Sequence, residues 1–323
     1  MREQYWLDGM MGLIVGDALG LPVQFSRPDD IALRPEGPVT GMEGYGAFHM
    51  PAGSWSDDGS MALCALESIN RLGRVEPADI AENFVKWMFD GAFTQYGMAY
   101  DMGNTCSRAI RHFALFHDPD TCGITGEHAN GNGALMRILP VCLYAYARQK
   151  ADDAYSDEDA IRDVRSVAAL THNHMRSHVA CGLYFFMVRA ILDYKGEMSL
   201  ADCLQLGVDQ GRLFYEEEPK NLHHIAHYQR LFDLATLRVT PDTELEFSGY
   251  VVRAFEAAVW GLLQEDSLEK TLLNIVNHGD DSDTVGAIAG GLAGLYYGYE
   301  AIPKDWLAAI RAREYVEDLA LDR

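Results

Sequence analysis

The stretch Asn277-His278-Gly279-Asp280-Asp281-Ser282-Asp283-Thr284 runs directly into Val285-Gly286-Ala287-Ile288-Ala289-Gly290-Gly291-Leu292-Ala293-Gly294. Acidic and hydroxyl side chains therefore stand at the start of an apolar helix. Gly286, Gly290 and Gly294 recur every fourth residue, so one face of this helix carries no side chains. Each glycine destabilises a helix interior by about 1 kcal/mol, and we expect the bare face to let another helix approach closely.

A second acidic helix start lies far earlier in the chain. The segment Ser54-Trp55-Ser56-Asp57-Asp58-Gly59-Ser60 precedes an expected helix over residues 61–72. Such residues can simply cap a helix, but two adjacent carboxylates and a hydroxyl also suit hard divalent cations. The two acidic starts could converge on one metal site. Their carboxylates would repel one another without cations, and two ions would balance the charge better than one.

Apolar residues elsewhere follow the helical period. Ile80, Phe84, Trp87 and Met88 form one apolar stripe, as do Val252, Phe255, Val259 and Leu262. Further stretches of this kind span residues 61–72, 134–147, 161–170, 175–194, 221–237 and 306–315. No run of alternating residues lies between hairpin turns, and no linker or repeat divides the chain. The pattern predicts an all-α protein with residues 1–323 in a single domain.

The charge balance limits the classes of partner. Lys and Arg number 26 against 48 Asp and Glu, which gives a formal net charge of −22. Such a chain repels a phosphate backbone, so nucleic-acid binding is not expected. A small anionic ligand requires bound metal or backbone dipoles to reverse the local field.

The cysteines and apolar runs indicate the compartment. Six cysteines form no C-x-x-C pair and are expected to be buried free thiols in a reducing compartment. Asp8 and Gly9 interrupt any signal-like apolar core, and the uncharged run 284–299 is shorter than the roughly 20 residues that span a bilayer. We expect a cytoplasmic protein without a membrane partner.

Residues 26–54 contain four prolines and five glycines without helical period. A structureless stretch of this length inside a domain is usually functional or disordered. Because the segment carries Tyr45, Phe48 and His49 and leads into the acidic cluster at Asp57, we interpret it as a lid over the substrate.

A glycine turn and a histidine group complete the candidates. In Gly131-Asn132-Gly133-Ala134-Leu135-Met136-Arg137 a loop is expected to turn into a helix, whose free N–H groups could bind phosphate beside the charge of Arg137. An ordinary turn is the alternative. His174 and His178 share a helix face, but no Glu lies between them as zinc protease chemistry requires. The histidines at positions 223, 224 and 227 are expected at the surface or facing a partner.

Together these motifs resemble the ADP-ribosylglycohydrolase family, the all-helical enzymes typified by dinitrogenase-reductase-activating glycohydrolase. Five pieces match in the family's order and extend from residue 12 to about residue 298 of the chain. They are Gly16-Asp17-Ala18-Leu19-Gly20, Trp55-Ser56-Asp57-Asp58, Gly131-Asn132-Gly133-Ala134-Leu135-Met136-Arg137, Thr171-His172, and Asp281-Ser282-Asp283-Thr284 with its Gly-Ala helix.

The resemblance implies a single compact orthogonal multi-helix domain with a di-metal site at helix N-termini. Two divalent cations, Mg²⁺ or Mn²⁺, would be held by Ser56, Asp57, Asp58, Asp281, Asp283 and Thr284. Asp58 and Asp281 are the candidates for orienting or deprotonating the water that attacks the anomeric carbon. The implied substrate contacts are Gln24, Gly131, Asn132, Gly133, Ala134, Arg137 and His172.

The chain departs from the family at two positions. Gln24 stands where many members carry a Glu with a catalytic or gating role, and an amide cannot accept a proton as a general base. Either a metal-bound Asp takes over that role, or the activity is weak or differently directed. Asp280 stands where the family often has Gly and could add charge near the metals.

The function predicted from this resemblance is hydrolysis of an ADP-ribosylated side chain, with arginine chosen by its frequency in the family. A first alternative is another conjugate, such as ADP-ribosyl-serine or O-acetyl-ADP-ribose. A second is a non-catalytic binder of ADP-ribose or of a partner protein. An immunity protein against an ADP-ribosyltransferase toxin would combine hydrolysis with direct blocking of the toxin. All six metal-ligand positions are present, which argues against a binder, whereas Gln24 argues mildly for one.

Overall fold

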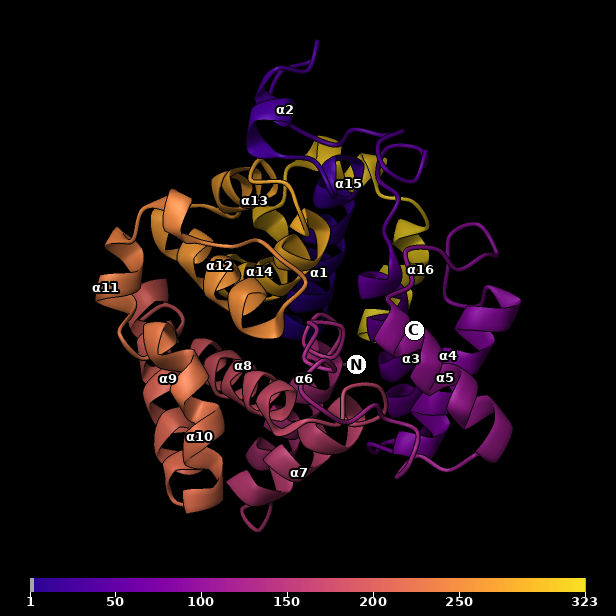
Figure 1. The fold of residues 1–323 in the computed structure, drawn as a ribbon, viewed down its shortest axis with the longest axis vertical. Helices are drawn as coiled ribbons and strands as arrows, with labels where there is room; N and C mark the ends of the chain where they lie inside the picture. The colour runs from indigo at the N-terminus through magenta and orange to yellow at the C-terminus, as the bar shows by residue number, and fades with distance from the viewer. Residues whose placement is uncertain (1–2, 323) are drawn as a thin grey trace.

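The computed structural model describes residues 3–322 and is helical throughout (Figure 1). The α-helices are α1 (Tyr5–Gly20), α2 (Pro28–Ala32), α3 (Asp57–Leu72), α4 (Pro77–Asp90), α5 (Asn104–Phe116), α6 (Leu139–Ala151), α7 (Asp157–Ala168), α8 (Met175–Tyr194), α9 (Leu200–Glu216), α10 (Leu222–Ile225), α11 (Leu234–Val239), α12 (Val251–Gln264), α13 (Leu268–Val276), α14 (Ser282–Tyr297), α15 (Lys304–Ala309) and α16 (Arg313–Leu321). Short 3₁₀ segments are η1 (Leu21–Val23), η2 (Pro219–Asn221), η3 (Ala226–Phe232), η4 (Asp242–Glu244) and η5 (Tyr299–Ala301). Residues 3–322 contain isolated β-bridges but no strand, which confirms the all-α prediction.

The most extensive helix pair is α1 with α14, which lie side by side near the centre of the molecule (Figure 1). The sequence predicted that another helix would approach the bare glycine face of α14. That helix is α1, which carries its own glycines every four residues. A methyl group on Gly16 would overlap the carbonyl oxygen of Gly286, and one on Gly12 would overlap that of Gly290. The two backbones touch without intervening side chains.

Helix α1 is apolar on all sides, and every residue after Tyr5 is buried. By length and composition the stretch Tyr5–Val23 could cross a membrane, but 94% of it is buried inside the molecule. A helix that is hydrophobic all round and surrounded by protein is typical of the core of a large domain. It packs against α14, α3, α6 and α16, so most of the molecule is organised around it.

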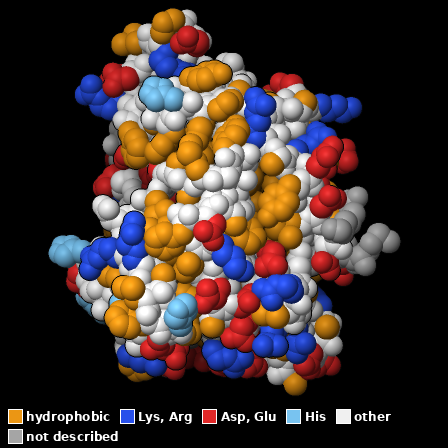
Figure 2. Space-filling view, turned by 90° about the vertical axis from the view of Figure 1, so that its right-hand side faces the viewer, with side chains coloured by type: hydrophobic (Ala, Val, Ile, Leu, Met, Phe, Trp, Pro, Cys, Tyr) orange, Lys and Arg blue, Asp and Glu red, His pale blue; other side chains and the backbone are white. Residues whose placement is uncertain are grey.

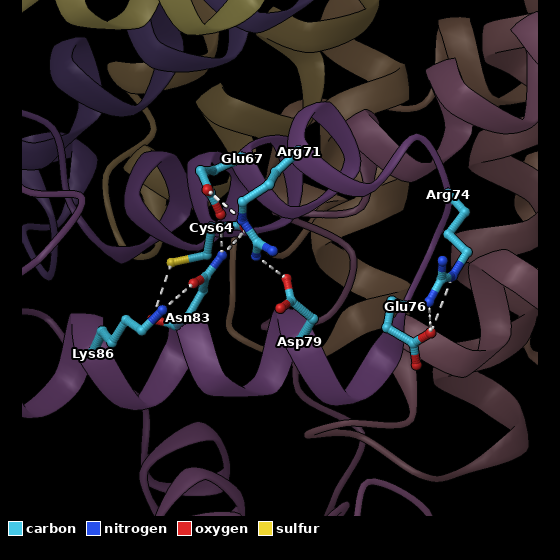
Figure 3. Close-up of polar contacts among 8 residues, drawn as sticks. All are labelled: Cys64, Glu67, Arg71, Arg74, Glu76, Asp79, Asn83 and Lys86. Atoms are coloured by element: carbon cyan, nitrogen blue, oxygen red, sulfur yellow. Dashed lines mark hydrogen bonds and ion pairs between the residues drawn. The ribbon is translucent and has the colours of Figure 1, made fainter.

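Helix α3 is fixed against α4 by polar side chains along their interface (Figure 3). The amide of the buried Asn83 donates to the carbonyl oxygen of Cys64 at 3.0 Å and to Glu67 Oε2 at 2.7 Å. Arg71 bridges Glu67 on its own helix and Asp79 on α4. These contacts hold the C-terminal half of α3, and thereby orient the acidic residues at its start.

Two expected helices are divided in the structure. Residues 221–237 form α10, η3 and α11, because Asp233 leaves helical geometry and accepts a hydrogen bond from Thr236 N to begin a new helix. Residues 306–315 divide between α15 and α16. There Arg311 N donates to Gly53 O, and Ala312 takes a positive φ of 51°. In both places a local side-chain or tertiary hydrogen bond competes with helix continuation.

The segment 26–54 contains one short helix, α2, which the sequence did not predict; Pro28 stands at its start, with Asp29 and Asp30 in its first turn. The rest is irregular and attached at defined points. The Asn277 side chain accepts from Val39 N at 2.8 Å and donates to Val39 O at 3.0 Å. The function of this segment as a lid stays a hypothesis.

The six cysteines are free and buried, as expected (Cys64, Cys106, Cys122, Cys142, Cys181 and Cys203). The surface charges are mixed on the face shown in Figure 2. Hydrophobic side chains gather in its upper and middle parts, while acidic and basic side chains alternate in its lower part. The net charge of −22 is therefore not collected into one acidic surface on this face.

Replacement of Gly16 by Ala tests the backbone contact. The added methyl group overlaps the α14 backbone, which cannot move like a flexible side chain. We expect Gly16→Ala to lower the free energy of unfolding by roughly 3 kcal/mol or more, measured by urea denaturation.

Gly103→Ala is the matched control, because Gly103 has a φ of −61° and open space around its α-carbon. Equal stability of the two variants would contradict the close approach of α1 and α14.

Candidate metal centre

The start of α3 presents the first acidic group. Ser56 is the N-cap: its Oγ accepts weakly from Asp58 N and donates to Asp58 Oδ2 at 2.9 Å. The Ser56 hydroxyl therefore caps the helix, and it is also the hydroxyl expected to bind a cation. Asp57 is 6% exposed and Asp58 is completely buried, although a cap needs no buried carboxylate.

The start of α14 presents the second group. Asp281 is its N-cap residue, and Asp283 and Thr284 lie in the first turn. Asp283 Oδ1 accepts from Thr284 N at 2.9 Å, while Asp281 Oδ2 accepts from Asn132 Nδ2 at 2.6 Å. The amide of Asn132 thus connects the glycine turn to the acidic cluster.

The two helix starts meet, and a third helix contributes to the same cluster. Asp17, Asp58 and Asp283 each offer a carboxylate oxygen within 4.8 Å of the others. Asp17 lies inside α1 and accepts from Ser56 N at 2.9 Å and Gly59 N at 3.0 Å. From the sequence, Asp17 was named only as part of the motif at residues 16–20 and was given no role in metal binding. A charged residue within an otherwise apolar helix was the signal that could have identified it.

Asp101 is a further member that sequence reasoning missed. It lies in the loop between α4 and α5 with a φ of 55°, and its carboxyl group lies next to the side chains of Asp283 and Gln24. Gln24 is 5% exposed, and its side chain lies next to Asp101. Nothing in the loop sequence around Asp101 distinguishes it from an ordinary turn, so only the fold reveals its position.

Several oxygens in the cluster are buried without a hydrogen-bond donor. They are Asp58 Oδ1, Asp283 Oδ2, Asp101 Oδ2 and Gln24 Oε1. An unpaired buried acceptor costs free energy, and a buried unpaired carboxylate costs far more. Hard divalent cations take oxygen ligands of this type. The donor set therefore fits a cation, and the residues that could hold it include Asp17 besides the six expected from the sequence.

Burial and mutual repulsion raise the pKa of the carboxyl groups. Burial is the larger cause at each position. It raises the pKa of Asp17 to about 7 and that of Asp281 to about 6. Burial and then neighbouring carboxylates raise the pKa of Asp57, Asp58 and Asp283 well above the usual range. The cluster holds protons near neutral pH unless a cation replaces them.

The glycine turn does not begin a helix where the sequence expected one. Residues 131–137 form turns, and α6 begins at Leu139. Pro140 has no N–H and its ring would clash with the preceding turn, so a helix cannot run through 134–147. The turn is held instead by Asn132 N donating to Gly249 O and by Val251 N donating to Asn130 O.

The charge of Arg137 was expected beside a phosphate on the glycine turn, but the guanidinium is buried underneath that turn. Its side chain is completely buried, donates to Gly133 O, Val167 O and Thr171 Oγ1, and stacks on Phe84 at 4.7 Å. His172 lies against Gly131 and Gly133. The structure thus brings the expected substrate contacts 131–134 and His172 together, with Arg137 behind them.

The histidines form no comparable cluster. His174 is the N-cap of α8, and its ring contacts His224 at 5.3 Å between centroids. His178 is buried, and burial lowers its pKa to about 3. Within residues 3–322 the only group with metal-ligand spacing is Asp17, Asp58 and Asp283.

The larger cavities lie outside this cluster. One of about 520 Å³ lies among α7, α8 and α9, and contains none of the expected site residues. Another of about 550 Å³ is lined by Phe25, Ser26 and Asp280, which are chain neighbours of Gln24 and Asp281.

The fold and the cluster together define an all-helical protein with an oxygen-only ligand group at converging helix starts. A family model described as ADP-ribosylglycohydrolase matches residues 3–323. The chain belongs to the ADP-ribosylglycohydrolase family and is an ADP-ribosyl glycohydrolase, a hydrolase.

Relatives and a solved structure agree with this membership. The chain is 30% identical over 304 residues to the ADP-ribosyl-[dinitrogen reductase] glycohydrolase of Rhodospirillum rubrum, covering 94% of this chain and 89% of the relative. It is 29% identical over 311 residues to the ADP-ribosylarginine hydrolase Tri1 of Serratia proteamaculans, covering 96% and 76%. A structure titled ADP-ribosylglycohydrolase-related protein complex matches with a TM-score of 0.74 at 30% identity, covering 98% and 96%.

The raised pKa values predict how stability depends on pH and cations. Unfolded aspartates titrate near pH 4, so between pH 4 and about 7 the folded cluster retains protons that the unfolded chain has lost. The cluster's contribution to the free energy of unfolding therefore falls as pH rises through that window, by on the order of a few kcal/mol. Thermal unfolding in EDTA should show this loss, and Mg²⁺ or Mn²⁺ should stabilise the protein more at pH 8 than at pH 5.

Asp58→Asn should raise stability in EDTA at pH 8 and reduce the response to cations. Glu36→Gln, at an exposed position, is the control and should do neither. A cation response that is equal at pH 5 and pH 8, and unchanged in Asp58→Asn, would contradict this assignment.

Proposed function

We propose that the protein releases ADP-ribose from ADP-ribosylated arginine side chains with the help of two divalent cations, Mg²⁺ or Mn²⁺. The observation that carries the proposal is the buried carboxylate cluster with unpaired oxygens at the meeting of α1, α3 and α14. Arginine is favoured because the Serratia relative is named an ADP-ribosylarginine hydrolase.

The cations would be held by the residues that the sequence identified at the two helix starts: Ser56, Asp57, Asp58, Asp281, Asp283 and Thr284. When bound, such ions orient the ribose hydroxyls and lower the pKa of water. Asp17 and Asp101 add carboxylate charge from two further elements. Asp17 also accepts from the backbone of Ser56 and Gly59 and so fixes the start of α3 relative to α1.

Side chains of the protein would stabilise the transition state, accept the proton from water and bind the pyrophosphate. Cleavage of a glycosidic bond passes through an oxocarbenium-like state, which nearby carboxylates stabilise. Asp281 is the candidate to orient or deprotonate the water; burial raises the pKa of its carboxyl to about 6 when no cation is bound, and its Oδ2 is held by Asn132 Nδ2 at 2.6 Å. Asp58 keeps Oδ1 free while Ser56 holds Oδ2. The 131–134 turn and His172 would bind the pyrophosphate.

Two alternatives are distinguishable by experiment. The same cluster could act on ADP-ribosyl-serine or O-acetyl-ADP-ribose, because these conjugates present the same ADP-ribose group to it. An immunity-type protein that blocks an ADP-ribosyltransferase toxin would bind ADP-ribose or the toxin with weak turnover. The free carboxylate oxygens favour a hydrolase over a binder, because a binder gains nothing from unpaired buried charge.

The test is release of free ADP-ribose from arginine-linked and serine-linked ADP-ribosyl peptides in Mg²⁺, in Mn²⁺ and in EDTA. Cation-dependent release from the arginine-linked peptide supports the proposal. Release from the serine-linked peptide alone assigns the first alternative. Tight binding of ADP-ribose without release from either peptide assigns the binder.

Replacement of the carboxylates tests the cation role in turnover. Asp58→Asn and Asp283→Asn each remove a charge and an unpaired oxygen from the cluster. We expect each to lower kcat by at least about a hundredfold, with the helical fold intact by circular dichroism. Unchanged turnover in both variants would remove the metal hypothesis, and Glu36→Gln serves again as the control.

Gln24→Glu tests the departure from the family. Gln24 reaches the cluster through Asp101, and a carboxylate there would supply a general base. We expect kcat to rise by about tenfold or more, within the range general bases contribute. Gln24→Met, of similar size without a carboxylate, should not raise it. An unchanged kcat in Gln24→Glu would mean that an aspartate of the cluster already accepts the proton.

A further inference from the structure

The buried guanidinium of Arg137 lies at the centre of a hydrogen-bond chain behind the 131–133 turn. Its Nε donates to Gly133 O at 3.1 Å, and its Nη2 donates to Thr171 Oγ1 at 2.8 Å. Its acceptors among residues 3–322 are carbonyl and hydroxyl oxygens, and no carboxylate pairs with it. A completely buried arginine without a counter-ion is costly, so a role beyond packing is expected of it.

Thr171 occupies the next position in the chain of hydrogen bonds. Arginine is only a donor, so Thr171 Oγ1 must accept from Arg137. The same oxygen lies 2.9 Å from His172 Nδ1. The Cys106 thiol lies near the Thr171 side chain and donates weakly to Gly133 O at 4.0 Å. The hydroxyl has a single proton, and an imidazole nitrogen is a better acceptor for it than a thiol sulfur. All groups are satisfied when Thr171 donates to Nδ1 and Cys106 donates to Gly133 O.

The backbone of His172 and of its two chain neighbours is fixed by hydrogen bonds. Its backbone N donates to Ala168 O, and its neighbours Thr171 and Asn173 are paired through their backbones with Ile124. Burial and then the Arg137 charge lower the pKa of the imidazole to about 3, so it is neutral at physiological pH. A neutral imidazole has one N–H and one acceptor nitrogen.

The other ring nitrogen of His172 faces the glycine turn. A methyl group added to Gly131 would lie 3.3 Å from Nε2, and one added to Gly133 would lie 2.9 Å from Cε1. Nε2 has no hydrogen-bond partner within residues 3–322. Glycine at both positions leaves the imidazole edge and the turn in direct apposition.

We propose that Arg137 and Thr171 are positioning residues that keep the His172 proton on Nε2 and aim that N–H at the 131–133 turn. Thr171 Oγ1 accepts from Arg137, and a proton on Nδ1 would leave the buried hydroxyl proton no acceptor better than the thiol sulfur of Cys106, so the hydroxyl donates to Nδ1. Because Nδ1 accepts, Nε2 carries the proton and acts as a donor. The same guanidinium holds Gly133 O, so the donor and the turn are fixed relative to each other.

The ligand atom that this donor suits is an anionic oxygen, and this part of the inference rests on the proposed function. A phosphate oxygen of ADP-ribose on the 131–133 turn would accept from Nε2 of His172. The tautomer itself does not depend on hydrolysis. Failure of the hydrolase proposal and failure of this one are therefore distinguishable.

The first measurement is the tautomer of His172 by long-range ¹H–¹⁵N correlation NMR of the ¹⁵N-labelled full chain, with the signal assigned by its loss in His172→Gln. The ring of the wild-type protein should show the proton on Nε2. Thr171→Val removes the hydroxyl donor and should shift the ring toward the Nδ1–H tautomer, whereas Thr171→Ser should keep the wild-type pattern. Thr271→Val is the matched control, because the Thr271 hydroxyl is equally buried and has no hydrogen-bond partner.

The second measurement is ADP-ribose affinity by calorimetry. Thr171→Val should weaken binding by roughly 10- to 100-fold, as expected for loss of a hydrogen bond to a charged group. Thr171→Ser and Thr271→Val should stay within about twofold of the wild type. His172→Gln retains an N–H near the Nε2 position, and in that background Thr171→Val should have little further effect.

Each outcome decides the proposal. An Nε2–H tautomer that persists in Thr171→Val overturns it, as does an additive effect of Thr171→Val in the His172→Gln background. Should Thr171→Val fail to fold, Arg137→Lys replaces it. That variant keeps the charge but cannot reach Gly133 and Thr171 together, so it should weaken ADP-ribose binding and give a mixed tautomer, and an unchanged tautomer and affinity would overturn the proposal.

Discussion

Helices α1 and α14 touch backbone to backbone, and that contact brings Asp17 of α1 beside Asp283 of α14 in the acidic cluster. Gly20 at the end of α1 lies against the backbone of Asp283, and Ser282 Oγ donates to Gly20 O at 3.1 Å. A side chain between these helices would separate Asp17 from Asp283 and open the cluster. The glycines lower intrinsic helix stability, and the burial of the many apolar residues of α1 offsets that loss.

The cluster collects charge where a folded chain ordinarily avoids it. Asp17, Asp58 and Asp283 are completely buried, and burial and repulsion act together to raise their pKa. The backbone N–H groups of Ser56 and Gly59 satisfy Asp17, whereas Asp58 and Asp283 each keep one unpaired oxygen. This division suggests separate roles: Asp17 organises the start of α3, and the unpaired oxygens are left for a ligand.

Sequence reasoning identified the acidic helix starts because each is a local pattern with a chemical meaning. Asp57, Asp58, Asp281 and Asp283 stand at helix N-termini in the sequence and in the structure. Asp17 and Asp101 were missed because a residue inside a helix or in an irregular loop acquires its neighbours only through the fold. Arg137 was expected at the start of a helix with its charge beside the glycine turn, but it lies in a buried turn. The reason is local, because Pro140 prevents the helix from starting before Leu139.

The helical class, the apolar faces, the two acidic helix starts and the bare glycine face were all predictable from the sequence, because each depends on residues within a few positions of one another. Three other features became visible only in the folded protein. Helix α1 is the partner of the bare glycine face, and Asp17 and Asp101 join the acidic cluster. Arg137 is buried next to Thr171 and is not exposed beside the glycine turn. These features arise between segments far apart in the chain. Their energies depend on burial and on carbonyl, hydroxyl and carboxylate partners that no local pattern specifies.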